Sequence, residues 1–187
     1  VYVYLRTGTS WTQQAKLTVS GVQLAGGSVA LEGDTLAFST RNGTANTVWI
    51  SHRTGSTWSA PTALTPMGGA IGDAFGASLS FSNGSLAVGA PGVNGGGSDR
   101  GAVYVFVDSG SAFTQQGMLT ASNPQDQDSL GTAVAIDGDI LVAGAPNRDG
   151  GGGAVDIGIA SVFTRSGNAW SQQAVLVGPP SAGSSFG

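Results

Sequence analysis

Short apolar runs alternate with polar, glycine-rich turns along the whole chain. The runs are rich in Val, Ile, Leu, Phe, Tyr and Thr, the residues that favour β-strands. Asn83-Gly84 and Ser109-Gly110-Ser111 each separate two neighbouring runs, as is typical of hairpin turns. No stretch combines a 3.6-residue apolar period with helix caps, so we expect essentially no helix. Around these two turns the pattern predicts strands near 75–82, 85–90, 102–108 and 112–120.

The same pattern returns several times along the chain. With Leu36, Leu86 and Leu141 in register, three segments align without a gap: AGGSVALEGDTLAFST (25–40), FGASLSFSNGSLAVGA (75–90) and LGTAVAIDGDILVAGA (130–145). A second pattern follows in each unit and occurs four times in all. Its aromatic residue is Trp11, Trp58, Phe113 and Trp170. These recurrences indicate an internal repeat of roughly 50 residues.

A repeat with four short antiparallel strands is typical of a β-propeller blade, because a single four-stranded sheet buries both faces only against neighbouring blades. We therefore predict an all-β fold, a β-propeller of four-stranded antiparallel blades seen as a partial ring of about three and a half blades. We expect the chain to be a processed product or a piece of a longer propeller. The predicted single propeller region, 1–187, comprises an outer half-blade (1–20), three blades (25–65, 75–120 and 130–177) and the start of another (178–187).

Composition narrows the classes of partner. Seven Lys and Arg against eleven Asp and Glu give a formal net charge of −4, and the basic residues are scattered, which disfavours a nucleic-acid partner. No apolar run approaches the roughly 20 residues of a membrane span. The chain has no cysteine, which excludes disulfides and thiol chemistry. Low charge with abundant Gly, Ser, Thr, Asn and Gln resembles bacterial surface proteins, so we expect an extracellular or cell-surface location.

Two short motifs carry a family resemblance. Phe75-Gly76 with Gly89-Ala90-Pro91, and Leu130-Gly131 with Gly144-Ala145-Pro146, resemble the FG-GAP repeat. That repeat builds the blades of the integrin α-subunit propeller and of many bacterial surface proteins. The resemblance implies a propeller, usually of seven blades, that works in adhesion or ligand binding outside the cell.

Some members of the family that this chain resembles carry a calcium loop of the Asp-x-Asp-x-Asp-Gly type between the first two strands of a blade. The corresponding turns here hold only two or three residues, too few to supply six or more oxygen ligands. We therefore predict no cofactor, and Asp126 with Asp128 is the alternative calcium site. In the competing interpretation, which recurrence favours, Asp128 and its equivalent Asp73 cap backbone amides at the turn between blades.

Two glycine-rich loops, 92–102 and 147–160, vary most between the repeats, and each joins the second strand of a blade to its third. Such loops lie on one face of a propeller, and binding residues often sit on loops carried by a rigid scaffold. The alternative is that both loops are flexible connectors. The predicted ligand-binding residues are Asp99, Arg100, Asn147, Arg148, Asp149 and Asp156.

The sequence predicts no catalytic residue. His52 is the only histidine, and no serine and carboxylate recur with it in a triad-like context. Glu32, Asp137 and Asp139 fall at equivalent hairpin turns, where turn chemistry explains them without an active site. The recurring Gln-Gln pairs are expected on a solvated outer strand, and they occupy 13–14, 115–116 and 172–173.

Three functional hypotheses follow. The favoured one is a non-enzymatic extracellular module that binds a protein or glycan ligand at a cell surface through loops on one face. The second is structural: the blades are assembly units of a surface protein or filament, with self-association through open blade edges. The third is part of a glycan-acting propeller enzyme, which would show a pocket with two carboxylates about 5–10 Å apart.

Overall fold

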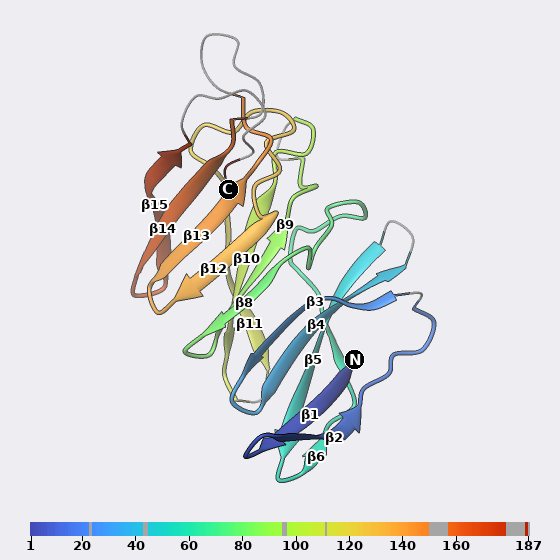
Figure 1. Ribbon diagram of the computed structural model, residues 1–187. Helices are drawn as coiled ribbons and strands as arrows, with labels where there is room; N and C mark the ends of the chain where they lie inside the picture. Colours follow the sequence, from blue (N-terminus) through green and yellow to red (C-terminus); the bar gives the residue numbers. More distant parts are fainter. Residues whose placement is uncertain are drawn as a thin grey trace.

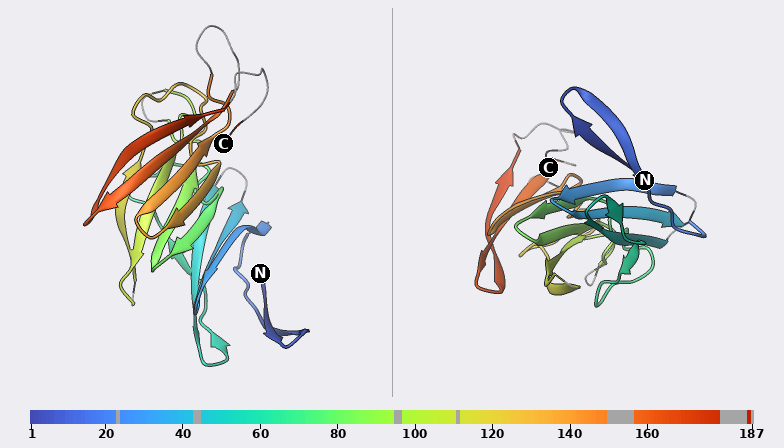
Figure 2. Two further views of the ribbon diagram at one scale, coloured as in Figure 1. Left: turned by 60° about the vertical axis from the view of Figure 1, so that its left-hand side comes forward. Right: turned by 90° about the horizontal axis from the view of Figure 1, so that it is seen from below.

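The computed structural model describes residues 1–22, 24–42, 45–94, 97–110, 112–149, 157–178 and 186. The regular structure of these residues is β throughout, and they contain no helix that is long and apolar enough to cross a membrane. Four sheets follow one another in chain order (Figure 1). Figure 2 shows the first and last sheets at opposite ends of this open row. The predicted all-β fold of antiparallel, unclosed propeller blades is confirmed.

Every strand pairs with neighbours that are antiparallel to it. The first sheet is the hairpin β1 (Tyr2–Thr7) and β2 (Ser10–Lys16). The second has the order β3-β4-β5-β6, with β7 also paired to β5: β3 (Leu24–Glu32), β4 (Thr35–Asn42), β5 (Ala45–Thr54), β6 (Thr57–Trp58) and β7 (Thr62–Leu64). The third sheet consists of β8 (Leu79–Ser82), β9 (Ser85–Ala90), β10 (Ala102–Asp108) and β11 (Phe113–Leu119). The fourth sheet consists of β12 (Ala133–Asp137), β13 (Ile140–Ala145), β14 (Ile159–Ser166) and β15 (Ala169–Val177).

The second sheet departs from the four-strand pattern at its outer edge. Its last strand is divided into β6 and β7, whereas β11 and β15 are continuous. Pro61 lies between the two pieces, and proline has no N–H to donate to a strand ladder. The equivalent positions on the other outer strands are Gln116 and Gln173. A single proline therefore accounts for the extra strand.

The Phe/Leu-Gly and Gly-Ala-Pro motifs meet across the inner hairpin of a blade. The Gly76 N–H donates to the Gly89 carbonyl at 2.9 Å, and the Gly131 N–H donates to the Gly144 carbonyl at 2.9 Å. Gly76 and Gly131 have φ of 89° and 93°, a left-handed conformation that favours glycine. Gly89 also has no room for a Cβ, because the Gly131 carbonyl of the next blade lies against it. The motifs therefore close each hairpin and join it to its neighbour.

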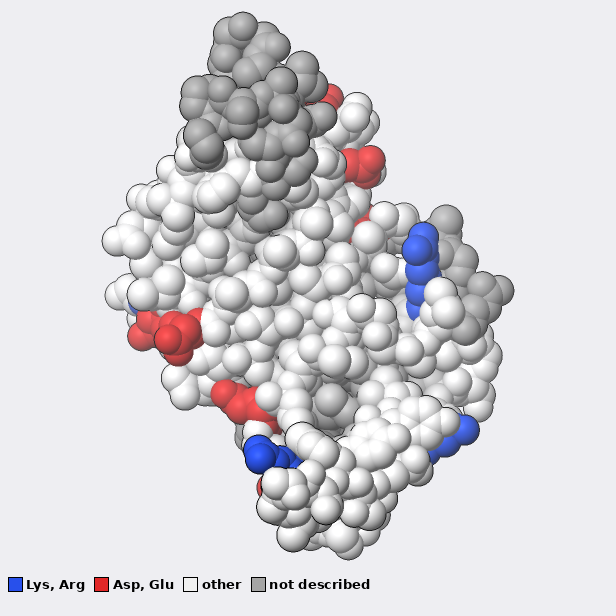
Figure 3. Space-filling model, in the orientation of Figure 1, with Lys and Arg blue, Asp and Glu red and all other residues white. Residues whose placement is uncertain are grey.

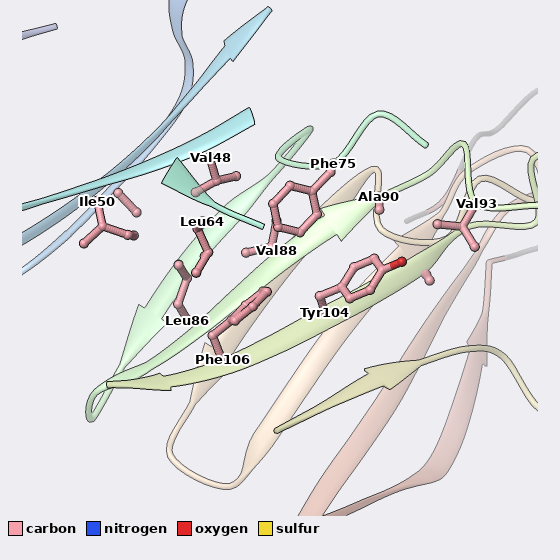
Figure 4. Packing of buried hydrophobic residues seen from close by; sticks show 12 residues of the cluster. Val48, Ile50, Leu64, Phe75, Leu86, Val88, Ala90, Val93, Tyr104 and Phe106 are labelled. Carbon is pink, nitrogen blue, oxygen red and sulfur yellow. The ribbon is translucent and has the colours of Figure 1, made fainter. Parts of the chain in front are cut away.

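The hydrophobic core lies between the sheets. In Figure 4, Val48, Ile50 and Leu64 of the second sheet face Leu86, Val88, Tyr104 and Phe106 of the third. Phe75, from the linker that enters the third sheet, packs edge-on against the Tyr104 ring with centroids 5.5 Å apart. Equivalent clusters join the third sheet to the fourth and the first to the second. Each sheet is thus stabilised by the sheets beside it.

Bulges on the outer strands supply polar contacts between sheets. The register of β2, β11 and β15 shifts by one residue, which leaves Gln14, Gln116 and Gln173 as bulge residues. The Trp58 indole N–H donates to Gln14 Oε1 at 2.9 Å, and the Trp170 indole N–H donates to Gln116 Oε1 at 2.7 Å. Each bond joins one sheet to the next. The prediction that these glutamines form a solvated edge is therefore wrong for Gln14 and Gln116.

The remaining interface lacks both partners of this contact. Pro61 stands where the bulge glutamine would be, and the equivalent of Trp58 and Trp170 on the third sheet is Phe113, which has no side-chain N–H. Phe113 instead stacks on the His52 ring, with centroids 6.3 Å apart. The glutamine acceptor and the tryptophan donor are thus both present between the first and second sheets and between the third and fourth. Both are replaced between the second and third sheets.

The inner hairpin turns also contact the neighbouring sheet. The Glu32 carboxylate accepts the N–H groups of Asn83 and Gly84 at 2.7 and 2.8 Å. At the next interface, the equivalent Ser82 Oγ accepts the Gly138 N–H at 2.9 Å. Turn chemistry does explain Glu32, but the turn that it binds belongs to the following sheet.

Candidate binding surface

The described parts of the two predicted loops lie at one end of the sheets, and both contact the linker between β11 and β12. The linker is hydrogen-bonded along the first loop: the Gln127 N–H donates to the Ser98 carbonyl at 2.6 Å, and the Ser129 N–H donates to the Asp99 carbonyl at 3.0 Å. Asn147, from the second loop, donates to Ser129 Oγ at 3.2 Å. The described residues of the loops and the linker therefore form one continuous surface, which we call the loop–linker surface (91–94, 97–101, 120–130 and 146–149).

Arg100 joins the first loop to the linker through Asp126. Its Nε donates to Asp126 Oδ1 at 2.8 Å, and the Asp126 carboxylate is exposed to solvent on its other side. This hydrogen bond holds the pKa of Asp126 below its ordinary value, and the positive charge of Arg100 adds to the effect. The carboxylate therefore stays ionised throughout the neutral range.

Arg148 joins the second loop to the same linker through Asp128. Its guanidinium lies 2.6 Å from Asp128 Oδ2 and also donates to the Asn123 carbonyl. The Asp128 side chain is buried, and its Oδ1 has no hydrogen-bond partner among the described residues. This ion pair holds the linker against the second loop, because removing either member leaves a buried charge without its partner.

Asp128 and Asp73 perform the capping role expected of them. Asp128 Oδ2 accepts the Gln125 N–H at 2.7 Å, and Asp73 Oδ2 accepts the Ala70 N–H at 2.6 Å, each across three residues. Asp73 also lies close enough to Tyr104 to affect it. Burial raises the pKa of the Tyr104 hydroxyl, and the Asp73 charge raises it further.

Asp126 and Asp128 do not converge on a common point, since each carboxylate faces a different arginine. Within the described part of the chain, no three acidic or histidine side chains gather closely enough to hold a metal ion. The two carboxylates of this alternative site instead form ion pairs with Arg100 and Arg148, which hold the linker to both loops.

Five of the six predicted ligand-binding residues belong to the loop–linker surface, and Asp156 lies outside the described residues. Asp99, Asn147 and Asp149 are exposed, whereas Arg100 and Arg148 are partly covered by their ion pairs. The sequence did not single out Gln127 and Ser129, which have positive φ and bring the linker against the first loop. The sequence carried no signal for this, because Ser129 and its equivalent Ala74 share a positive φ that only the backbone shows.

A pocket of about 280 Å³ opens beside the second loop. Arg148, Asp149 and Asn123 line its polar side, and Ile157, Ile159 and Val175 line its apolar side. Mixed walls of this kind suit a ligand with both polar and apolar faces, such as a sugar ring or a peptide side chain.

His52 and the turn carboxylates lie away from this surface. The His52 ring is within hydrogen-bond distance of Thr35 Oγ1, at 3.2 Å. Asp139 pairs with Arg165 at 2.7 Å at the opposite end of the strands. The face drawn in Figure 3 is mostly uncharged, and its acidic and basic side chains lie in small separate patches.

Comparison with known families agrees with the geometry of the repeats. A family model described as the FG-GAP repeat matches residues 58–106 and 113–163, which together exceed half of the chain. Both matches begin at the equivalent aromatic residues Trp58 and Phe113 and end at the equivalent Phe106 and Phe163, so each spans the interface between two sheets. A search of the curated proteins found no match. The chain belongs to the FG-GAP repeat family.

Proposed function

We propose that this chain is a non-enzymatic binding module of a bacterial cell surface, and that its loop–linker surface contacts a protein or glycan ligand. The observation that carries the proposal is the anchoring of that surface. Arg100 and Arg148 tie the linker to both loops, while Asp99, Asn147 and Asp149 stay exposed, and Asp149 also lines the pocket. A surface held in one shape loses little conformational entropy when a ligand binds.

The chemistry of the surface indicates what it would recognise. The exposed members of the predicted set, Asp99, Asn147 and Asp149, carry two carboxylates and one amide, and the two arginines already pair with Asp126 and Asp128. Carboxylates accept hydrogen bonds from sugar hydroxyls and attract lysine or arginine side chains of a protein, and an amide both donates and accepts hydrogen bonds. The extracellular location is supported by the absence of cysteine thiols, the low charge content and the FG-GAP repeats.

The test begins with a screen of the labelled 187-residue chain on a glycan array and on immobilised extracellular-matrix proteins. The best binder is then measured with Asp99→Asn and Asn147→Ala. Asparagine tolerates the φ of 48° at position 99, so the first change removes charge without straining the backbone. We expect the affinity to fall about tenfold, the effect of losing one or two charge-assisted hydrogen bonds.

Ser56→Ala is the matched control, because Ser56 is exposed on the β5–β6 turn at the opposite end of the strands. Binding unchanged by Asp99→Asn and Asn147→Ala, or reduced equally by Ser56→Ala, would contradict the proposed surface. Mass spectrometry of any glycan ligand after long incubation tests the non-enzymatic part. Shortened glycan products would support the glycan-acting enzyme instead.

A further inference from the structure

The linker between β7 and β8 repeats the backbone conformation of the linker between β11 and β12. Asp73 caps the first linker as Asp128 caps the second, each accepting the N–H of the residue three positions before it. Ala74 has φ 56°, and its equivalent Ser129 has φ 59°. Equivalent residues of the two linkers therefore present their backbone N–H groups in the same way.

In the β11–β12 linker, three of these N–H groups bind a segment of the first loop. The N–H groups of Gln127, Ser129 and Leu130 donate to loop carbonyls at 2.6, 3.0 and 3.1 Å. Gly101 also forms a parallel bridge with Leu130. Residues 98–101 therefore run parallel to the linker and are held by its main chain.

The β7–β8 linker has no such segment among the described residues. Its equivalent N–H groups, those of Gly72, Ala74 and Phe75, donate to no described acceptor. The connection that would supply a segment is short, because only residues 43–44 separate β4 from β5, whereas residues 91–101 separate β9 from β10. The difference between the two linkers therefore arises from a connection inside the chain.

A pocket of about 210 Å³ lies beside these three N–H groups. Leu64, Ile71 and Phe75 contribute apolar walls, and Asn46 and Thr47 contribute polar groups. None of the described residues that line the pocket is charged. Main-chain donors next to uncharged walls suit a peptide backbone with an uncharged side chain.

We propose that this pocket binds a short peptide segment of another protein, whose main-chain carbonyls accept the N–H groups of Gly72, Ala74 and Phe75. The peptide runs parallel to the linker, as residues 98–101 run along the β11–β12 linker. The occupant is a peptide because the equivalent backbone in this chain already holds one, through bonds that any peptide can make. The pocket lies outside the loop–linker surface, so this proposal does not depend on ligand binding there.

The repeat also indicates one side chain of the bound peptide. In the first loop, Arg100 pairs with Asp126 of the linker. Ile71 occupies the position of Asp126 in the β7–β8 linker, and it is 82% exposed. A leucine at the peptide position equivalent to Arg100 would bury apolar surface against Ile71, whereas an arginine would lose its carboxylate partner.

Amide hydrogen exchange of the ¹⁵N-labelled 187-residue chain tests the open donors. The N–H groups of Gly72, Ala74 and Phe75 should exchange at least about tenfold faster than their hydrogen-bonded equivalents in the β11–β12 linker. Equal protection of both sets would show that the first set already has a partner within the chain, and it would overturn the proposal.

Titration with a synthetic peptide then tests binding. The probe is acetyl-Gly-Ser-Asp-Leu-Gly-Ala-amide, which copies residues 97–102 with leucine in place of Arg100. We expect saturable shifts of the Gly72, Ala74 and Phe75 amide signals, and binding about fivefold tighter than that of the same peptide with arginine. No saturable shift at these amides would overturn the proposal, and tighter binding of the arginine peptide would overturn the contact with Ile71.

A matched pair of variants places the peptide in the pocket. Ala70→Trp fills the pocket from its exposed rim, and the equivalent Gln125 shows that this position accommodates a larger side chain. Gln125→Trp makes the same change on the linker that already holds a segment. The first variant should weaken peptide binding about tenfold or more, and the second should leave it unchanged. Equal affinity in Ala70→Trp and the wild-type chain would contradict the proposed site.

Discussion

At the residue scale, two aspartates only two positions apart have opposite environments. The Asp128 side chain is 2% exposed and faces Arg148, whereas the Asp126 side chain is 56% exposed and faces Arg100. In sequence they resemble a pair of metal ligands. In the structure, one carboxylate is part of the buried framework and the other belongs to the solvent-facing surface, so their energetic roles differ.

This difference predicts unequal effects on stability. Asp128→Ala should lower the free energy of unfolding by about 3 kcal/mol, because it removes a cap and leaves the Arg148 charge largely buried without its partner. Asp126→Ala should change stability little, because exposed ion pairs contribute little. Urea denaturation of the two variants makes the comparison. Equal losses in both variants would show that Asp128 is not buried as described.

At the element scale, the hairpins of a blade depend on glycines for two separate reasons. Some glycines only need a positive φ, as at the β14–β15 turn, where Gly167 has φ 60° and open space around it. Gly131 needs a positive φ and also lies against the Ala102 carbonyl and the Ala90 N–H of the preceding blade. Gly131 is the glycine of the Phe/Leu-Gly motif, so the motif glycine meets the second requirement, a close approach of the neighbouring blade.

Alanine substitution at these two positions separates the reasons. Gly167→Ala should cost about 1 kcal/mol, the cost of placing a Cβ in the left-handed region. Gly131→Ala should cost at least about 2 kcal/mol more, because the added Cβ would lie only 2.5 Å from the Ala102 carbonyl oxygen and the two blades would have to separate. Thermal or chemical unfolding measures both. A similar loss of unfolding free energy in both variants would mean that the close approach between blades does not add to the cost of the substitution.

At the scale of the whole molecule, stability comes from interfaces between successive sheets. Polar contacts accompany the apolar clusters there, and the best defined is the bond from the Trp170 indole to Gln116. Arg165 lies over the Trp170 ring at 5.1 Å and pairs with Asp139, so it covers this bond from solvent. Arg53 lies over Trp58 in the same way at the first interface.

A double-mutant cycle with Gln116→Leu and Trp170→Phe measures this coupling between sheets. We expect a coupling free energy of about 1 kcal/mol, the typical net contribution of one hydrogen bond. Each single change should lower the free energy of unfolding, and the double variant should be no less stable than the less stable of the two single variants. The natural pair Pro61 and Phe113 shows that an interface can do without this bond when both partners change together. A coupling near zero would contradict this role.

The parts of the binding surface differ in how far sequence could predict them. Asp99, Arg100, Asn147, Arg148 and Asp149 could be selected because their loops vary between otherwise similar repeats. The pairing of Arg100 with Asp126 and of Arg148 with Asp128 could not be predicted, since 26 and 20 residues separate the partners. Such pairs depend on how the linker lies between the loops, and local patterns carry no information about that placement.

The sequence by itself determined the repeat, its strands and its tight turns, because apolar alternation and glycine positions act over a few residues. It also determined the family, since Phe75-Gly76 and Gly89-Ala90-Pro91 recur at fixed spacing. Only the tertiary structure decided what Gln14, Gln116 and Glu32 contact, because their partners lie on the next sheet. A bulge turns Gln116 toward Trp170, 54 residues later, and that direction exists only once the sheets have packed.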